Sequence, residues 1–177
     1  MIIVYHQASG FIDSTNLFGH VAIAFTGLGA KSFGISWMGA DEGFPTYHNY
    51  AGLRGKCVSN WQDALENRKK ERAFPQTREK IEIKSVESGN SGHSDPMSEK
   101  AAYDWWKALV KQATTRSDGM DFRSVPNWGG KDCADVVFAA LKAAGSEKIA
   151  SARTITRPVF TPPAAVQYAK SLQEKSE

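Results

Sequence analysis

Apolar and polar residues follow two different periods along this chain, strand-like in the first half and helix-like in the second. Apolar runs at 2–6, 21–25 and 32–38 are bounded by polar or glycine-containing turns, which predicts three strands. The second and third runs form a predicted hairpin over 20–38, because only a short turn separates them. Residues 80–86 alternate apolar and polar side chains and predict a further strand.

Helical spacing appears after residue 94, and Asp95-Pro96 has the residue types that begin a helix. The apolar positions of this predicted helix are Ala101, Ala102, Trp105, Trp106, Leu109, Val110 and Ala113. The two tryptophans are expected in the core. A second helix is predicted over 133–144, ended by Gly145, and a third follows Thr161-Pro162 with Val166, Ala169 and Leu172 on one face.

Two other segments give weaker patterns. Residues 60–72 have helical spacing, and residues 39–55, with scattered Gly, Pro and Asn, are expected to form a long irregular loop. No repeat or domain boundary divides the 177 residues, so residues 1–177 are predicted to form a single α+β domain with an antiparallel sheet.

Composition excludes several classes of function. A formal net charge of +3, without a long basic stripe, argues against nucleic-acid binding. No apolar run reaches the ~18 residues of a membrane span, and the start of the chain lacks the pattern of a secretory signal. The four histidines and two cysteines show no metal-ligand spacing, and no phosphate-binding loop follows a strand. No cofactor or metal is therefore predicted.

Cys133 is the strongest candidate for chemistry. It follows Gly129-Gly130 and opens the predicted helix, where unpaired N–H groups and the helix dipole favour a thiolate. The same N–H groups can hold an oxyanion after the sulfur attacks a carbonyl. Asp132 is placed to cap this helix, and Asp135 to match its dipole. Cys57 is interpreted as a structural thiol.

His20 is the matching candidate base, since it stands at the head of the apolar strand 21–25. If the hairpin turns about Leu28, residue 20 faces Ser36, which makes Ser36 a candidate third residue to orient the imidazole. His48, Asp41 and Glu42 are the rivals for that role. A histidine and a cysteine so placed are the minimum parts of a cysteine hydrolase or acyltransferase.

These motifs carry a resemblance to a known family. The segments concerned are Gly19-His20-Val21-Ala22-Ile23, Gly34-Ile35-Ser36-Trp37, the helix with Trp105-Trp106, the segment from Asp132-Cys133-Ala134-Asp135 to Gly145, and the tail from Phe160-Thr161-Pro162. With the histidine before the cysteine, the chain resembles the circularly permuted branch of the papain-like NlpC/P60 superfamily. More closely, it resembles cysteine hydrolase effectors of bacterial type VI secretion systems. Asp132 and Met38 depart from that pattern, where Asn and Pro are expected.

The resemblance implies a permuted papain-like fold, Cys133 as nucleophile, His20 as base and Ser36 as a weak third residue. It also implies an antibacterial toxin that is made in the bacterial cytoplasm and cleaves peptidoglycan peptides in the periplasm of a target cell. A cognate immunity protein and the secretion apparatus would be its partners. Three alternatives stay open: a thiol acyltransferase or lipase of the lecithin:retinol acyltransferase kind, a protein-directed cysteine protease or deamidase, and a non-catalytic binding module.

Overall fold

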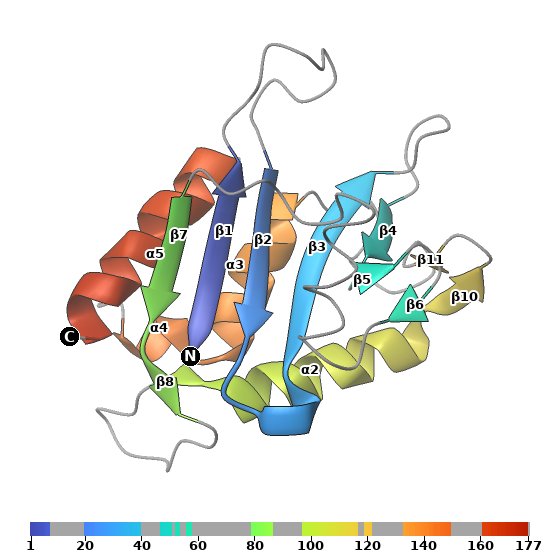
Figure 1. The fold of residues 1–177 in the computed structure, drawn as a ribbon, viewed down its shortest axis with the longest axis horizontal. Helices are drawn as coiled ribbons and strands as arrows, with labels where there is room; N and C mark the ends of the chain where they lie inside the picture. Colours follow the sequence, from blue (N-terminus) through green and yellow to red (C-terminus); the bar gives the residue numbers. More distant parts are fainter. Residues whose placement is uncertain are drawn as a thin grey trace.

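A computed structural model describes residues 1–7, 20–39, 47–50, 52–53, 56–57, 79–86, 97–116, 119–121, 133–149 and 161–176 (Figure 1). The strands are β1 (Ile2–Gln7), β2 (His20–Phe25), β3 (Phe33–Gly39), β4 (Tyr47–Tyr50), β5 (Gly52–Leu53), β6 (Lys56–Cys57), β7 (Glu79–Ile83), β8 (Ser85–Val86), β9 (Met97–Ser98), β10 (Thr114–Arg116) and β11 (Gly119–Asp121). The helices are the 3₁₀ turn η1 (Gly29–Lys31), α2 (Glu99–Gln112), α3 (Cys133–Ala143), α4 (Ser146–Ile149) and α5 (Pro162–Ser176).

The main sheet has the strand order β10-β11-β4-β3-β2-β1-β7, and each neighbouring pair is antiparallel. β5 pairs with β6, and β8 pairs with β9 in parallel, so these form two small additional ladders. The predicted α+β class with an antiparallel sheet is confirmed. The predicted hairpin over 20–38 is also confirmed, as β2 and β3 joined by η1.

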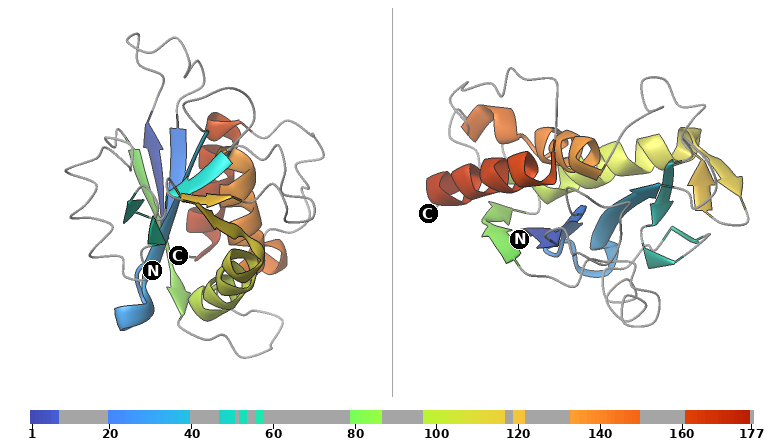
Figure 2. Two further views of the ribbon diagram at one scale, coloured as in Figure 1. Left: turned by 90° about the vertical axis from the view of Figure 1, so that its right-hand side faces the viewer. Right: turned by 90° about the horizontal axis from the view of Figure 1, so that it is seen from above.

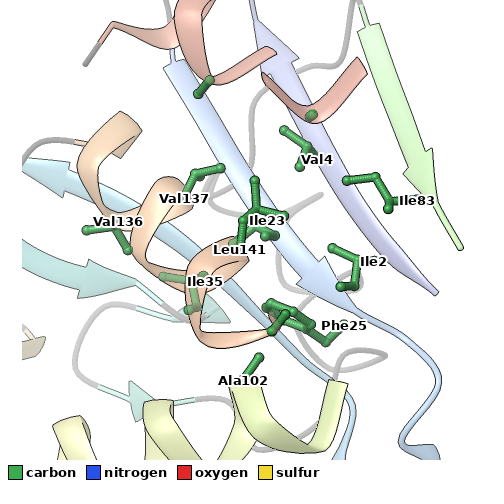
Figure 3. Packing of buried hydrophobic residues seen from close by; sticks show 14 of the residues in the cluster. Ile2, Val4, Ile23, Phe25, Ile35, Ile83, Ala102, Val136, Val137 and Leu141 are labelled. Carbon is green, nitrogen blue, oxygen red and sulfur yellow. The ribbon is translucent and has the colours of Figure 1, made fainter. Parts of the chain in front are cut away.

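One face of the sheet is covered by helices, and the hydrophobic core lies between the two layers (Figure 2). Alternate residues of β1, β2 and β3 enter this core, as the period of two requires. The core residues of β1, β2, β3 and β7 are Ile2, Val4, Val21, Ile23, Phe25, Phe33, Ile35, Ile81 and Ile83. Figure 3 shows Val137 and Leu141 of α3 beside Ile23 of β2. Stacked rings of Phe25 and Phe33, 4.7 Å apart, close one end of this layer.

Helix α2 begins later than the sequence indicates. Its N-cap is Ser98, whose hydroxyl accepts a hydrogen bond from the Ala101 N–H at 3.2 Å, so the prediction that Asp95 caps this helix is wrong. Residues 97–98 are extended instead, because they pair with β8. The buried stripe is Glu99, Ala102, Trp106 and Leu109. Trp106 is a core residue as predicted, and Trp105 is half-buried against the core.

Helices α3 and α5 match their predicted limits closely. α3 ends before Gly145, whose φ of +98° is the left-handed conformation that favours glycine, and whose N–H donates to the Lys142 carbonyl at 2.9 Å. α5 begins at Pro162 after Thr161, whose hydroxyl accepts from the Ala164 N–H at 3.4 Å. Both helices bury one stripe of small and branched residues against the sheet, so their ends and their buried faces agree with the pattern.

The prediction that residues 39–55 form only an irregular loop is wrong, because this segment contains β4 and β5. β4 has no apolar alternation of its own, and it is a strand because β3 and β11 supply hydrogen-bonding partners on both sides. Cys57 lies in β6. The predicted helix over 60–72 lies outside the described residues.

Glu99 is a fully buried carboxylate at the start of α2. It accepts hydrogen bonds from the Gly27 N–H at 2.7 Å and from the Ser85 hydroxyl at 2.5 Å, and it also pairs with the N-terminal ammonium of Met1. The Ser98 N–H beside it donates to the Ala144 carbonyl at 2.8 Å. These bonds join the end of β2, the start of α2 and the end of α3 at one end of the molecule.

Candidate active site

Cys133 is the first residue of α3, as predicted. Its side chain is half-buried and packs against the hydrophobic core. Ala134, Val136 and Val137 are buried, so the start of the helix is fixed against the sheet. A thiol at the start of a helix lies beside the N–H groups of the first turn and the positive end of the helix dipole, and both stabilise negative charge on sulfur.

His20 is the first residue of β2, and its backbone pairs with Gln7 at the end of β1. β2 is a main contact of α3 on the sheet. α3 ends near the end of β2, because the Ala144 carbonyl binds Ser98 while the neighbouring Glu99 binds Gly27. The two elements therefore run in the same direction, and both begin at the same edge of the sheet (the upper edge in Figure 1). The first residues of the two elements are Cys133 and His20.

Ser36 does not lie directly opposite residue 20, so that prediction is wrong. The structure pairs Ser36 with Ala22, two residues further along β2. The turn is longer than assumed, because η1 adds residues between the strands, with Lys31 and Ser32 donating to Leu28 and Gly29. A shift of two keeps residues 20 and 36 at register positions of the same face, as diagonal neighbours.

The other candidates for the residue that orients the imidazole lie in different parts of the chain. His48 lies in β4, opposite Met38 of β3 and Asp121 of β11. Asp41, Glu42 and Asp132 lie outside the described residues. Asp135 is half-buried in the first turn of α3, the position expected for a carboxylate that complements the helix dipole.

His6 is a residue that the sequence reasoning passed over. It lies in β1 opposite Val21, and its side chain is 14% exposed. Its Nδ1 is 3.6 Å from Glu79 Oε2, while its Nε2 is buried and has no hydrogen-bond partner among the described residues. The alternation Ile2, Val4, His6 was the available signal, because it places an imidazole in an otherwise apolar stripe.

Glu79 is held from its other side by Lys170 of α5, which pairs with Oε1. The hydrogen bond from Lys170 keeps the pKa of Glu79 below its usual value, although burial acts to raise it. His6 also lowers this pKa, by a smaller amount than Lys170 does. Glu79 therefore stays ionised and is suited to hold an imidazole N–H.

Groups of His, Cys, Asp and Glu that could bind a metal ion are absent from the part of the chain that the structure describes. In that same part, no helix has both the length and the apolar composition needed to cross a membrane. Comparisons with protein-family models, with curated proteins and with solved structures found no match to this chain.

Proposed function

We propose that this protein is a cysteine hydrolase with a permuted papain-like fold that cleaves amide bonds, with Cys133 as nucleophile. One observation carries the proposal. The half-buried thiol at the start of α3 lies at the edge of the sheet where β2 also begins, with a histidine as its first residue. A nucleophile at a helix start and an imidazole on a rigid strand are the two groups that such catalysis needs.

In the proposed reaction an imidazole takes the proton of the Cys133 thiol, and the resemblance assigns this role to His20. The thiolate attacks the carbonyl carbon of the amide, and the N–H groups of the first turn of α3 bind the oxyanion. The protonated imidazole then gives its proton to the leaving amine, which leaves a thioester on Cys133. Water hydrolyses the thioester and restores the thiol, so no cofactor is needed.

Peptide stems of peptidoglycan are the proposed substrate, and this part of the proposal rests on the resemblance to type VI secretion effectors. Delivery into the periplasm of a target cell, and an immunity protein that blocks the site, belong to the same proposal. The thiol chemistry and the substrate are separate claims, so they are tested separately.

The first test measures whether Cys133 is a reactive thiol. In a Cys57→Ala background, iodoacetamide should alkylate Cys133 rapidly at pH 6–7, because a thiolate stabilised by a helix start and an imidazole persists below the ordinary thiol pKa of ~8.5. Alkylation that appears only above about pH 8 contradicts the proposed mechanism.

The second test identifies the bond. Purified protein is incubated with isolated sacculi, and the soluble fragments are analysed by mass spectrometry beside the Cys133→Ala variant. New free amino and carboxyl ends that depend on Cys133 support an amidase. Transfer of an acyl group to an added amine or alcohol, without release of free acid, indicates an acyltransferase instead. If Cys133 is reactive but the sacculi stay intact, peptidoglycan is not the substrate, and the proposed thiol chemistry still stands.

A further inference from the structure

His6 and Glu79 form a carboxylate–imidazole pair on the face of the sheet that the helices cover. Glu79 contacts Lys170 of α5, and Ile2 and Val4 on the same side of β1 belong to the core beneath the helices. His6 is the next residue in this alternation, opposite Val21. The pair therefore lies on the side of the sheet against which α3 packs.

The pair also lies at the correct end of that face. β1 ends at Gln7, which pairs with His20, so His6 is one residue from the edge where β2 and α3 begin. By contrast, regular alternation from Val21 and Ile23 places position 20 on the same side of β2 as Ala22 and Ala24. These two alanines are buried, but they do not belong to the core cluster beneath the helices. A base at position 20 requires a departure from alternation at the strand end, and a base at position 6 requires none.

The polar atoms of His6 are arranged as in a general base. Nδ1 faces the carboxylate of Glu79 at 3.6 Å, and a carboxylate on that side of the ring favours a proton on Nδ1 over one on Nε2. Nε2 is left with its lone pair, buried and without a hydrogen-bond partner among the described residues, which is costly unless the atom has a use. The distance between a general base and the group it deprotonates is often long in a free protein. It commonly shortens only when the substrate binds, or one water bridges the two groups.

We propose that His6, oriented by Glu79, accepts the proton of Cys133 in the first step of the proposed reaction. The S–H bond breaks with its electron pair left on sulfur, and the proton moves to Nε2. The Glu79 carboxylate then holds the Nδ1–H of the imidazolium. This inference rests on the proposed cysteine chemistry, and it changes which histidine performs it. Glu79 is a positioning residue in this scheme, because it acts only through His6.

The test compares alkylation of Cys133 by iodoacetamide between pH 5 and 9 in Cys57→Ala protein and its variants. The charged groups next to His6 are Glu79 of β7, which faces its Nδ1, and Lys170 of α5, which pairs with Glu79; Asp135 lies in the first turn of α3, the helix that begins at Cys133. His6→Gln should lower the alkylation rate at pH 6 by about tenfold or more, because the thiol reverts toward its ordinary pKa. Glu79→Gln should narrow the pH range of rapid alkylation, since the imidazolium loses its carboxylate.

Glu82→Gln is the matched control. Glu82 lies on the same strand as Glu79 but pairs with Lys80 at an exposed position, so its loss should leave the profile unchanged. Should His6→Gln fail to fold, Glu79→Gln alone decides the question through the width of the profile. His20→Gln is measured in parallel, because the resemblance assigns the role of base to His20.

The outcomes separate the two proposals. Loss of low-pH reactivity in His20→Gln, with His6→Gln and Glu79→Gln like the parent, overturns the role of His6 and leaves the cysteine mechanism in place. A parent protein whose Cys133 reacts only above about pH 8 overturns the cysteine mechanism itself. A profile changed equally by Glu79→Gln and Glu82→Gln contradicts the positioning role of Glu79.

Discussion

Ser36 pairs with Ala22 across the β2–β3 hairpin, and it lies two residues from direct opposition to His20. This diagonal relation leaves Ser36 at a register position of the same face, at a separation of roughly 7–8 Å between residues. A serine hydroxyl at that distance orients an imidazole less strongly than a carboxylate in direct contact with the ring.

Ser36→Ala should therefore cause only a partial loss of activity. We expect a decrease of less than about tenfold in kcat/KM, well below the ~10²–10⁴ that a buried orienting carboxylate is worth. The measurement is the rate of release of peptide fragments from sacculi, with His20→Ala and His6→Gln assayed beside it. A loss in Ser36→Ala as large as that of a histidine variant would assign Ser36 a direct role.

Cys133→Ala should abolish hydrolysis and leave the fold intact. The side chain is half-buried, so its truncation removes little packing, and we expect a change of about 1 kcal/mol or less in the free energy of unfolding. Chemical denaturation and activity are measured on the same preparation. Cys57→Ala is the matched control and should keep its activity. Turnover retained by Cys133→Ala contradicts the nucleophile assignment.

Glu99→Gln should destabilise the protein strongly. The carboxylate of Glu99 is fully buried and binds the Gly27 N–H, the Ser85 hydroxyl and the ammonium of Met1, and an amide cannot accept from all of them. We expect a loss of roughly 2–4 kcal/mol, measured by urea denaturation. Asp104→Asn, which breaks the exposed pair of Asp104 with Lys100, should cost about 0.5 kcal/mol or less. Equal effects of the two variants would show that burial of Glu99 does not matter.

Gly145→Ala tests the end of α3. Gly145 has a φ of +98°, and a Cβ added there meets no atom within 4 Å, so the cost is one of backbone conformation alone. We expect a loss of about 1–2 kcal/mol for alanine and less for Gly145→Asn, which tolerates positive φ better. Thermal unfolding of the two variants checks this order. If alanine and asparagine are equally destabilising, the backbone explanation fails.

Glu79→Gln should change how stability depends on pH. The pKa of Glu79 is lowered in the folded state, mainly by Lys170, so its contribution is present above the ordinary carboxyl pKa of 4.5. That contribution is lost as pH falls below this value and through the folded-state pKa. The difference in unfolding free energy between parent and variant should therefore be constant above about pH 6 and should shrink in acid. A difference that grows in acid contradicts the assignment.

Local patterns by themselves determined much of the framework. The apolar runs of β1, β2 and β3, the helix that starts at Cys133 and ends before Gly145, and the Thr161-Pro162 start of α5 were all predictable. Each depends on interactions within a few residues: alternation along a strand, helical spacing, a hydroxyl cap and a glycine at positive φ. The position of Cys133 at the start of a helix was predictable for the same reason, since two glycines followed by helical spacing are a local arrangement.

Only the tertiary structure decided the rest. β4 and the Ser98 cap of α2 depend on partners far away in the chain, and η1 alone shifts Ser36 from His20 to Ala22. The pair of His6 and Glu79 joins residues from β1 and β7, and the direction of α3 relative to β2 determines that α3 and β2 begin at the same edge of the sheet. Sequence periodicity tells how a segment buries one face, but it carries no information on which neighbour supplies the opposite surface. The choice between His6 and His20 is therefore a question of sheet register.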